Sequence, residues 1–282
     1  MTSAPSSSAN FCYRHPDRQS YILCQRCGRT ICPQCQTQAA VGVHCPECVR
    51  EARASAPRTK SRLITSLRTP GQPIVTWSII ALCILVYVLQ MLPGSQVTNA
   101  LLYFGPYTYT EPWRMITALF VHSQGSLLHI ALNMFSLFLF GPILERLVGR
   151  VRFLVLYLVS GFGGSVAVLL LAPTTPVVGA SGAIFGLLGA FFVIQRKFGG
   201  NTTQLLVVIG INLVVGFLPG TNIAWQAHVG GLVAGAAVAF VYLRTRNRAQ
   251  RRTQILLVAA VVAALVLLTV VGAILLLRLM HG

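Results

Sequence analysis

The chain has 282 residues, of which 22 are Lys or Arg and only 5 are Asp or Glu, so its formal net charge is +17. Hydrophobic residues make up 55% of the chain and charged residues 10%, whereas a soluble domain typically carries roughly 25% charged residues. These figures exclude an ordinary soluble enzyme or DNA-binding protein and a disordered basic tail. They predict an integral membrane protein whose basic residues lie in loops.

The first 50 residues contain seven of the eight cysteines, mostly in pairs separated by two residues. Each such pair can supply two ligands to a tetrahedral metal ion. With one histidine, the set offers eight ligands and predicts two structural Zn²⁺: Cys12, His15, Cys24, Cys27, Cys32, Cys35, Cys45 and Cys48. Disulfides are the alternative, which the odd number of cysteines and the predicted cytoplasmic location disfavour.

This cysteine pattern resembles that of B-box-type zinc fingers. The resemblance implies cross-brace binding, with Cys12, His15, Cys32 and Cys35 on one ion and Cys24, Cys27, Cys45 and Cys48 on the other. His44 adjoins Cys45 and is an alternative ligand. A module this short can bury only a small apolar core. The bound metal would therefore supply its folding energy. We expect a structural or regulatory role, with a protein partner.

Residues 51–73 are basic and contain proline, which predicts a linker. Long apolar blocks follow, and a membrane-spanning helix needs about 20 mostly apolar residues. A polar stretch, residues 122–126, divides the longest block. We therefore predict seven spans, over about residues 74–92, 127–144, 152–172, 180–195, 204–219, 223–243 and 254–277. Residues 74–243 would form a six-helix core, and residues 244–282 a basic loop and a seventh helix.

The basic residues predict the orientation of the spans. If the chain crosses the membrane seven times, 20 of the 22 Lys and Arg fall on one face, and only Arg114 and Arg278 on the other. Basic residues accumulate on the cytoplasmic side of membrane proteins. We therefore expect a multi-pass plasma-membrane protein with a cytoplasmic N-terminus and an extracytoplasmic C-terminus.

Four polar side chains lie near the outer ends of the three spans that run inward: His129, Asn133, Ser181 and His228. At about 1.5 Å of rise per residue, all four lie within roughly 10 Å of those ends. Polar groups inside spans are costly and usually face a bundle interior or a wet cavity. Taken singly, Ser181 could be a packing residue and His228 a hydrogen-bond donor in the bundle.

Together these residues predict nucleophilic catalysis. Ser181 begins a helix, where free backbone N–H groups suit an oxyanion, and His228 can accept its proton. Glycines on both spans permit close approach: Gly182, Gly186, Gly231 and Gly235. The spans contain no aspartate, which favours a Ser–His dyad. The Ser181 amide, His129 and Asn133 would stabilise the oxyanion.

The positions of two glutamates decide whether a carboxylate can join the predicted Ser–His dyad. Glu145 lies at the far end of its span from these groups, whereas Glu111 lies in an external loop and is not excluded by its position. A carboxylate beside His228 would turn the predicted dyad into a triad.

The sequence resembles the rhomboid intramembrane serine proteases. The resemblance rests on motifs that occur in the family's order: Trp113-Arg114, His129-x-x-x-Asn133, Gly179-x-Ser181-Gly182 and Ala227-His228-x-x-Gly231-x-x-x-Gly235. It implies a six-helix core, a serine on a short fourth helix in a cavity open to the outside, and cleavage of transmembrane segments without a catalytic cofactor. Gly179, Gly182 and Phe185 would line that cavity. Phe185 stands where the family often has a tyrosine stacked on the catalytic histidine.

Three other functions agree with parts of the sequence. A catalytically inactive rhomboid-like protein would bind transmembrane clients without cutting them, but such relatives usually lack the serine or the histidine. A small transporter would show intramembrane charges or inverted repeats. A membrane-tethered zinc-finger DNA-binding protein would leave Ser181 and His228 without a role. The expected partners are therefore transmembrane substrate segments and the lipid bilayer, and no nucleic acid is expected.

Overall fold

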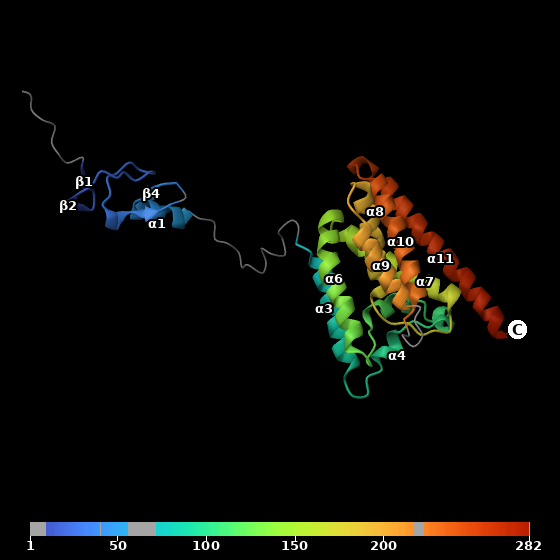
Figure 1. The fold of residues 1–282 in the computed structure, drawn as a ribbon. Coiled ribbons are helices and arrows are strands. Elements are labelled where there is room, and N and C mark those ends of the chain that lie inside the picture. Colours follow the sequence, from blue (N-terminus) through green and yellow to red (C-terminus); the bar gives the residue numbers. More distant parts are fainter. Residues whose placement is uncertain (1–9, 40, 56–71, 217–222, 282) are drawn as a thin grey trace, which may run out of the picture. The chain divides into compact units, whose positions relative to one another are not determined.

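The structure, a computed structural model, describes residues 10–39, 41–55, 72–216 and 223–281. The chain divides into two compact units, Met1–Ser66 and Leu67–Gly282, which are described separately (Figure 1). Most of the predicted linker, residues 56–71, lies outside the described residues, as do residues 217–219 at the end of the fifth predicted span.

The described residues of the first unit form short strands, the 3-10 helix η2 and the helix α1. Strands β1 (Phe11–Cys12) and β2 (His15–Gln19) form one antiparallel pair, and β3 (Thr37–Gln38) and β4 (Val43–His44) form another. The short 3-10 helix η2 (Pro33–Cys35) precedes β3, and helix α1 (Pro46–Ser55) follows β4. The buried hydrophobic cluster of the unit's described residues consists of six cysteines and Ile31. Such a core is too small to stabilise the unit by apolar burial alone.

The second unit is helical. In chain order it contains α3 (Ile74–Gln90), α4 (Val97–Leu101), η3 (Gly105–Thr108), α5 (Arg114–Thr117), η4 (Ala118–Phe120), α6 (Leu127–Val148), α7 (Arg150–Leu171), α8 (Ser181–Lys197), α9 (Thr203–Gly216), α10 (Trp225–Arg244), η5 (Arg248–Gln250) and α11 (Arg251–His281). Seven of these helices coincide with the seven predicted spans to within four residues at each described end. The fold is therefore all-helical in this unit, as predicted.

Four described helices, α6, α7, α10 and α11, are long and apolar enough to cross a membrane by length and composition. Helices α3 and α9 are apolar but shorter, with 17 and 14 residues, and α8 has 17 residues. At about 1.5 Å per residue, α8 is roughly 26 Å long, which is less than the ~30 Å hydrocarbon core of a bilayer. A helix this short can begin below the membrane surface.

Glycines bring α8 and α10 into the most extensive helix contact of the chain, beside α7 (Figure 1). A Cβ atom on Gly231 would overlap the Gly182 carbonyl group, only 2.7 Å from its carbon, and one on Gly235 would lie 2.5 Å from the Gly186 carbonyl carbon. No side chain other than hydrogen fits at either position. The small faces predicted from the sequence do meet, as in other close membrane-helix pairs.

Glu145 joins the end of α6 to the start of α3. Its carboxylate is 2% exposed and accepts hydrogen bonds from the Val75 N–H at 3.0 Å, the Thr76 N–H at 2.7 Å and the Thr76 hydroxyl at 2.7 Å. Pro73 at the N-cap of α3 has no side chain that can bond these groups. Glu145 therefore acts as the N-terminal capping residue of α3, because its carboxylate accepts hydrogen bonds from the first N–H groups of that helix.

Arg114 ties down the loop between α3 and α6. It is almost fully buried and pairs with Glu111 at 2.7 Å. It also donates hydrogen bonds to the carbonyls of Asn99 and Leu102, the second at 3.2 Å, and its guanidinium lies over the Tyr107 ring at 4.9 Å. Arg114 therefore holds this loop in place, and the carboxylate of Glu111 is engaged by that ion pair.

Candidate active site and metal centres

Ser181 is the first residue of α8 and is half-buried. Gly179 precedes it with φ of +119°, a backbone conformation that side-chain-bearing residues rarely adopt. The Gly179 N–H donates to the Ala118 carbonyl at 3.0 Å, which fixes the turn. No side chain caps α8, so the first N–H groups of the helix, including that of Ser181, remain available for an acceptor.

The His129 ring faces this turn. A Cβ atom on Gly179 would lie 2.8 Å from Cε1 and 2.9 Å from Nε2 of His129. The Nδ1 atom accepts a hydrogen bond from the Ser123 N–H at 3.1 Å. In the neutral ring the proton must therefore be on Nε2, the nitrogen closer to the serine turn. His129 thus offers a hydrogen-bond donor beside Gly179.

Asn133 is buried one helical turn after His129. Its Nδ2 donates to the His129 carbonyl at 2.7 Å, and its Oδ1 has no hydrogen-bond partner in the described part of the chain. An amide nitrogen carries two hydrogens, so one N–H remains for a ligand. Within the described parts of the chain, no hydrogen bond links Asn133 to the residues around Ser181; Asn133 lies on α6 and Ser181 on α8.

His228 lies on α10 and stacks on Phe185. The ring centroids are 4.1 Å apart and the planes differ by 7°. Phe185 follows Ser181 by one turn of α8, so the histidine packs against the helix face that carries the serine. His228 is 6% exposed, and its Nδ1 is buried without a hydrogen-bond partner among the described residues. The stacking considered from the sequence is therefore present with phenylalanine.

No hydrogen bond joins the Ser181 hydroxyl to the His228 ring in the described residues. Such bonds are often long before a substrate binds. The acidic side chains of the second unit are Glu111 and Glu145, bound to Arg114 and to the start of α3. Neither therefore orients His228.

His122, the first residue of the polar stretch that divides the longest apolar block, lies close to His129. The ring is fully buried, 5.5 Å from the His129 ring between centroids. Gln90, the last residue of α3, fixes its backbone by exchanging two hydrogen bonds with it, at 2.8 and 3.1 Å. Gln124 adds a third bond, to the Gln90 carbonyl at 2.6 Å. Gln90 is not among the residues predicted from the sequence; its signal there is a polar residue near the end of an apolar span.

The first unit contains two groups of possible metal ligands. Cys12, His15, Cys32 and Cys35 form one, and Cys24, Cys27, Cys45 and Cys48 the other. Within each group, the ligand atoms all lie within 4.8 Å of one another. This is the grouping that the cross-brace resemblance implied. His44 belongs to neither group, and none of the eight cysteines of the chain forms a disulfide.

The spacing of the donors fits a tetrahedral ion. The Nδ1 atom of His15 lies 3.8, 3.4 and 3.4 Å from the sulfurs of Cys12, Cys32 and Cys35. Metal–ligand distances of about 2.3 Å to sulfur and about 2.0 Å to nitrogen give tetrahedron edges of roughly 3.5–3.8 Å. The sulfurs of Cys27 and Cys45, in the second group, are 3.7 Å apart. Each group can therefore hold one metal ion.

The thiols of one group do not ionise alike without a cation. Burial, then the sulfurs of Cys12 and Cys32, raise the pKa of Cys35 to about 11. Burial also opposes ionisation of Cys12, but hydrogen bonds from the backbone of Cys32 and Arg14 outweigh it and lower the pKa to about 6. A bound cation favours the thiolate form of every ligand.

Comparison with known proteins identifies relatives of the second unit. The rhomboid domain family matches residues 109–245. "Rhomboid protease GluP" of Bacillus subtilis is 39% identical over 176 residues, which cover 58% of this chain and 34% of that protein. "Putative rhomboid protease YdcA" of the same organism is 36% identical over 143 residues, 49% of this chain and 71% of that protein.

A plant relative is similar to a comparable extent. "RHOMBOID-like protein 6, mitochondrial" of Arabidopsis thaliana is 38% identical over 140 residues, 47% of this chain and 44% of that protein. The chain therefore spans less than half the length of this relative and of GluP, while it covers most of YdcA.

Proposed function

Because the chain belongs to the rhomboid family, we propose that it is an intramembrane serine endopeptidase that cleaves transmembrane segments of membrane proteins. One observation carries the proposal. Gly182 and Gly231 bring α8 and α10 into backbone contact, and the ring of His228 lies on Phe185, one turn from Ser181. A serine at a helix start beside a histidine of a neighbouring helix is the arrangement that nucleophilic catalysis needs.

The proposed reaction begins when the Ser181 Oγ attacks the scissile carbonyl carbon while His228 accepts the hydroxyl proton. The C–N bond of the tetrahedral intermediate then breaks, and His228 donates that proton to the leaving amine. Water attacks the acyl-enzyme, with His228 again as the base, and releases the new carboxylate and Ser181. Since Glu111 and Glu145 are occupied elsewhere, the apparatus is a dyad.

Three donors would stabilise the negative oxygen of the intermediate. They are the Ser181 N–H, the Nε2–H of His129 and the free amide N–H of Asn133. The Ser123 backbone supports the His129 role, because it occupies Nδ1 and leaves the proton on Nε2. Loss of one such donor typically costs about 10²–10³ in rate.

Cleavage of a single-pass reporter protein by the purified full chain tests the proposal. Wild type should cut the reporter within its transmembrane segment, and Ser181→Ala and His228→Ala should abolish the cut. Ser160→Ala is the matched control, because it removes a buried serine hydroxyl that has no hydrogen-bond partner in the described residues. Binding of the reporter without cleavage would instead indicate an inactive rhomboid-like protein.

The chain is a multi-pass membrane protein, as its family and its apolar helices indicate. Its location in the plasma membrane, with the N-terminus cytoplasmic and the active site and C-terminus extracytoplasmic, belongs to the proposal. The distribution of 20 of 22 basic residues on one face supports it. Reporter domains fused to each terminus should report opposite sides of the membrane; reports from the same side would contradict it.

We further propose that the first unit binds two structural Zn²⁺, one in each ligand group. Zinc would supply the folding energy that a core of cysteines and Ile31 lacks. Purified chain should contain about two zinc ions by elemental analysis, and Cys35→Ser should lose at least one. Cys83→Ser is the control, because Cys83 lies in α3 of the other unit. Equal zinc in both variants, or none in wild type, would contradict the assignment.

A further inference from the structure

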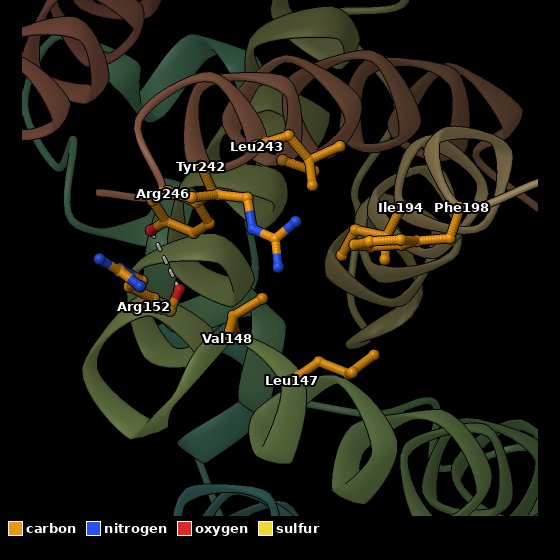
Figure 2. A pocket seen from close by; sticks show the side chains of 9 residues that line it. Leu147, Val148, Arg152, Ile194, Phe198, Tyr242, Leu243 and Arg246 are labelled. Atoms are coloured by element: carbon orange, nitrogen blue, oxygen red, sulfur yellow. Dashed lines mark hydrogen bonds between the residues drawn. The ribbon is translucent and has the colours of Figure 1, made fainter. Parts of the chain in front are cut away.

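A pocket lies at the ends of the helices opposite to Ser181. The C-terminal ends of α6, α8 and α10 and the first turn of α7 surround a space of about 300 Å³ (Figure 2). Its walls are mostly apolar and include Val148, Ile194 and Leu243. It shares no lining residue with the candidate active site.

Two arginines enter this apolar space. Figure 2 shows the Arg246 guanidinium among Leu243, Val148 and Ile194, and Arg152 at the edge beside Tyr242. Arg246 lies over the Phe198 ring at 5.1 Å, and Arg152 over the Tyr242 ring at 5.8 Å. Arg152 also donates to the Gln254 side chain at 2.7 Å. Aromatic rings and one amide hold these cations in place without neutralising them.

The second unit has no acidic side chain left to neutralise the two arginines. Its two carboxylates, Glu111 and Glu145, pair with Arg114 and with the start of α3. No carboxylate lies within 4.0 Å of Arg152 or Arg246 in the described residues. Arg152 is half-buried and Arg246 is exposed, so both guanidinium groups are available to an anion at the mouth of the pocket.

The mouth of the pocket favours an anion that carries acyl chains. Phe198 and Leu147 line the pocket and are 61% and 57% exposed. Leu147 lies in the last turn of α6, a helix long and apolar enough to cross a membrane, and Phe198 follows directly on α8. In a membrane, exposed apolar side chains at these positions would meet lipid. The volume is at the lower limit for small-molecule pockets, so a headgroup fits inside while its chains lie outside against Leu147 and Phe198.

We propose that this pocket binds an anionic phospholipid, with the headgroup phosphate between Arg152 and Arg246 and the acyl chains leaving past Leu147 and Phe198. Basic pockets between transmembrane helices on the cytoplasmic side are suited to such headgroups. The proposal does not depend on proteolytic activity, because the pocket lies at the other helix ends.

Native mass spectrometry of the full chain, titrated with phosphatidylglycerol or phosphatidylcholine, tests the proposal. Wild type should retain phosphatidylglycerol with at least about tenfold preference over phosphatidylcholine. A basic side chain near the membrane surface contributes roughly a factor of five to anionic lipid attraction. The Arg152→Gln/Arg246→Gln variant should therefore bind phosphatidylglycerol at least about tenfold more weakly.

A matched double variant, Arg196→Gln/Arg251→Gln, removes the same charge from two exposed residues that do not line the pocket. Its affinity for phosphatidylglycerol should fall less than about threefold. An equal loss of affinity in both double variants would show only a general attraction to surface charge and would overturn the proposed site. Leu147→Trp keeps both arginines but narrows the mouth, and should also weaken binding; unchanged affinity would overturn the proposed path of the chains.

Two further measurements keep the result interpretable. Replacing Arg152 also removes its contacts with Tyr242 and Gln254. The single variant Arg246→Gln, at an exposed position, leaves those contacts intact and should still weaken phosphatidylglycerol binding at least about threefold. Inorganic phosphate is added as a competitor. Displacement of the lipid only at concentrations far above those of the lipid supports the proposal, whereas displacement at similar concentrations would show a simple anion site and overturn it.

Discussion

Replacing Gly231 by alanine tests whether the close approach of α8 and α10 positions the proposed dyad. The added Cβ would lie 2.7 Å from the Gly182 carbonyl carbon and closer still to its oxygen. Ordinary contact begins at 3.4 Å, so the two helices must separate by at least 0.7 Å. Gly182 follows Ser181 directly, and Gly231 lies one turn after His228, so the shift is transmitted to both groups.

The expected loss of activity follows from that displacement. A misplacement of about 1 Å at reacting groups can lower a rate about 10²-fold. Overpacking of a well-filled interior typically costs about 1–3 kcal/mol of stability. We therefore expect Gly231→Ala to fold with a lower unfolding midpoint and to cleave the reporter about 10²-fold more slowly.

Gly210→Ala is the matched control, because a Cβ on this glycine of α9 meets no atom within 4 Å. Cleavage rate and thermal unfolding midpoint are measured for both variants in the same detergent. Gly210→Ala should cleave within about twofold of wild type, since it changes no contact and alanine favours helix. If Gly231→Ala is folded and cleaves as fast as Gly210→Ala, helix contact does not set the geometry of the dyad and the reasoning is refuted.

Three further predictions concern the supports of the site. Phe185→Leu should slow cleavage about three- to tenfold, because ring stacking contributes about 0.5–1.5 kcal/mol, whereas Phe185→Tyr should keep the wild-type rate. If Phe185→Leu cleaves as fast as Phe185→Tyr, stacking on His228 does not support catalysis. Glu145→Gln should lower stability by about 2 kcal/mol, since it weakens three hydrogen bonds to a charged acceptor, and an unchanged unfolding midpoint would contradict the capping role. Arg114→Gln should expose the loop between α3 and α6 to limited proteolysis, whereas Arg278→Gln should not; identical digestion patterns would show that other contacts hold the loop.

The helices of the second unit could be predicted because their signal is local. Each span is a long apolar run, and its ends fall where polar or basic residues interrupt it. The small faces of α8 and α10 could also be anticipated, because glycines spaced by four residues lie on one side of a helix. The contact between these helices at Gly182 and Gly231 could therefore be predicted from the sequence.

Other features depend on contacts between distant parts of the chain. Glu145 caps a helix that begins about 70 positions earlier, and nothing in its neighbourhood marks that role. The His129 ring is oriented by the backbone of Ser123, a group that every residue carries and that no sequence pattern reveals. The Nδ1 of His228 has no partner among the described residues, and this likewise depends on where the fold puts Glu111 and Glu145.

The most direct test of the central claim is to locate the adduct of a fluorophosphonate probe. An activated serine displaces fluoride from such a probe and forms a stable phosphoester at its Oγ. The account predicts one labelled residue, Ser181, by peptide mass spectrometry of the wild-type chain, and no label in His228→Ala. Equal labelling of wild type and Ser181→Ala, or an adduct on a different residue, would contradict it.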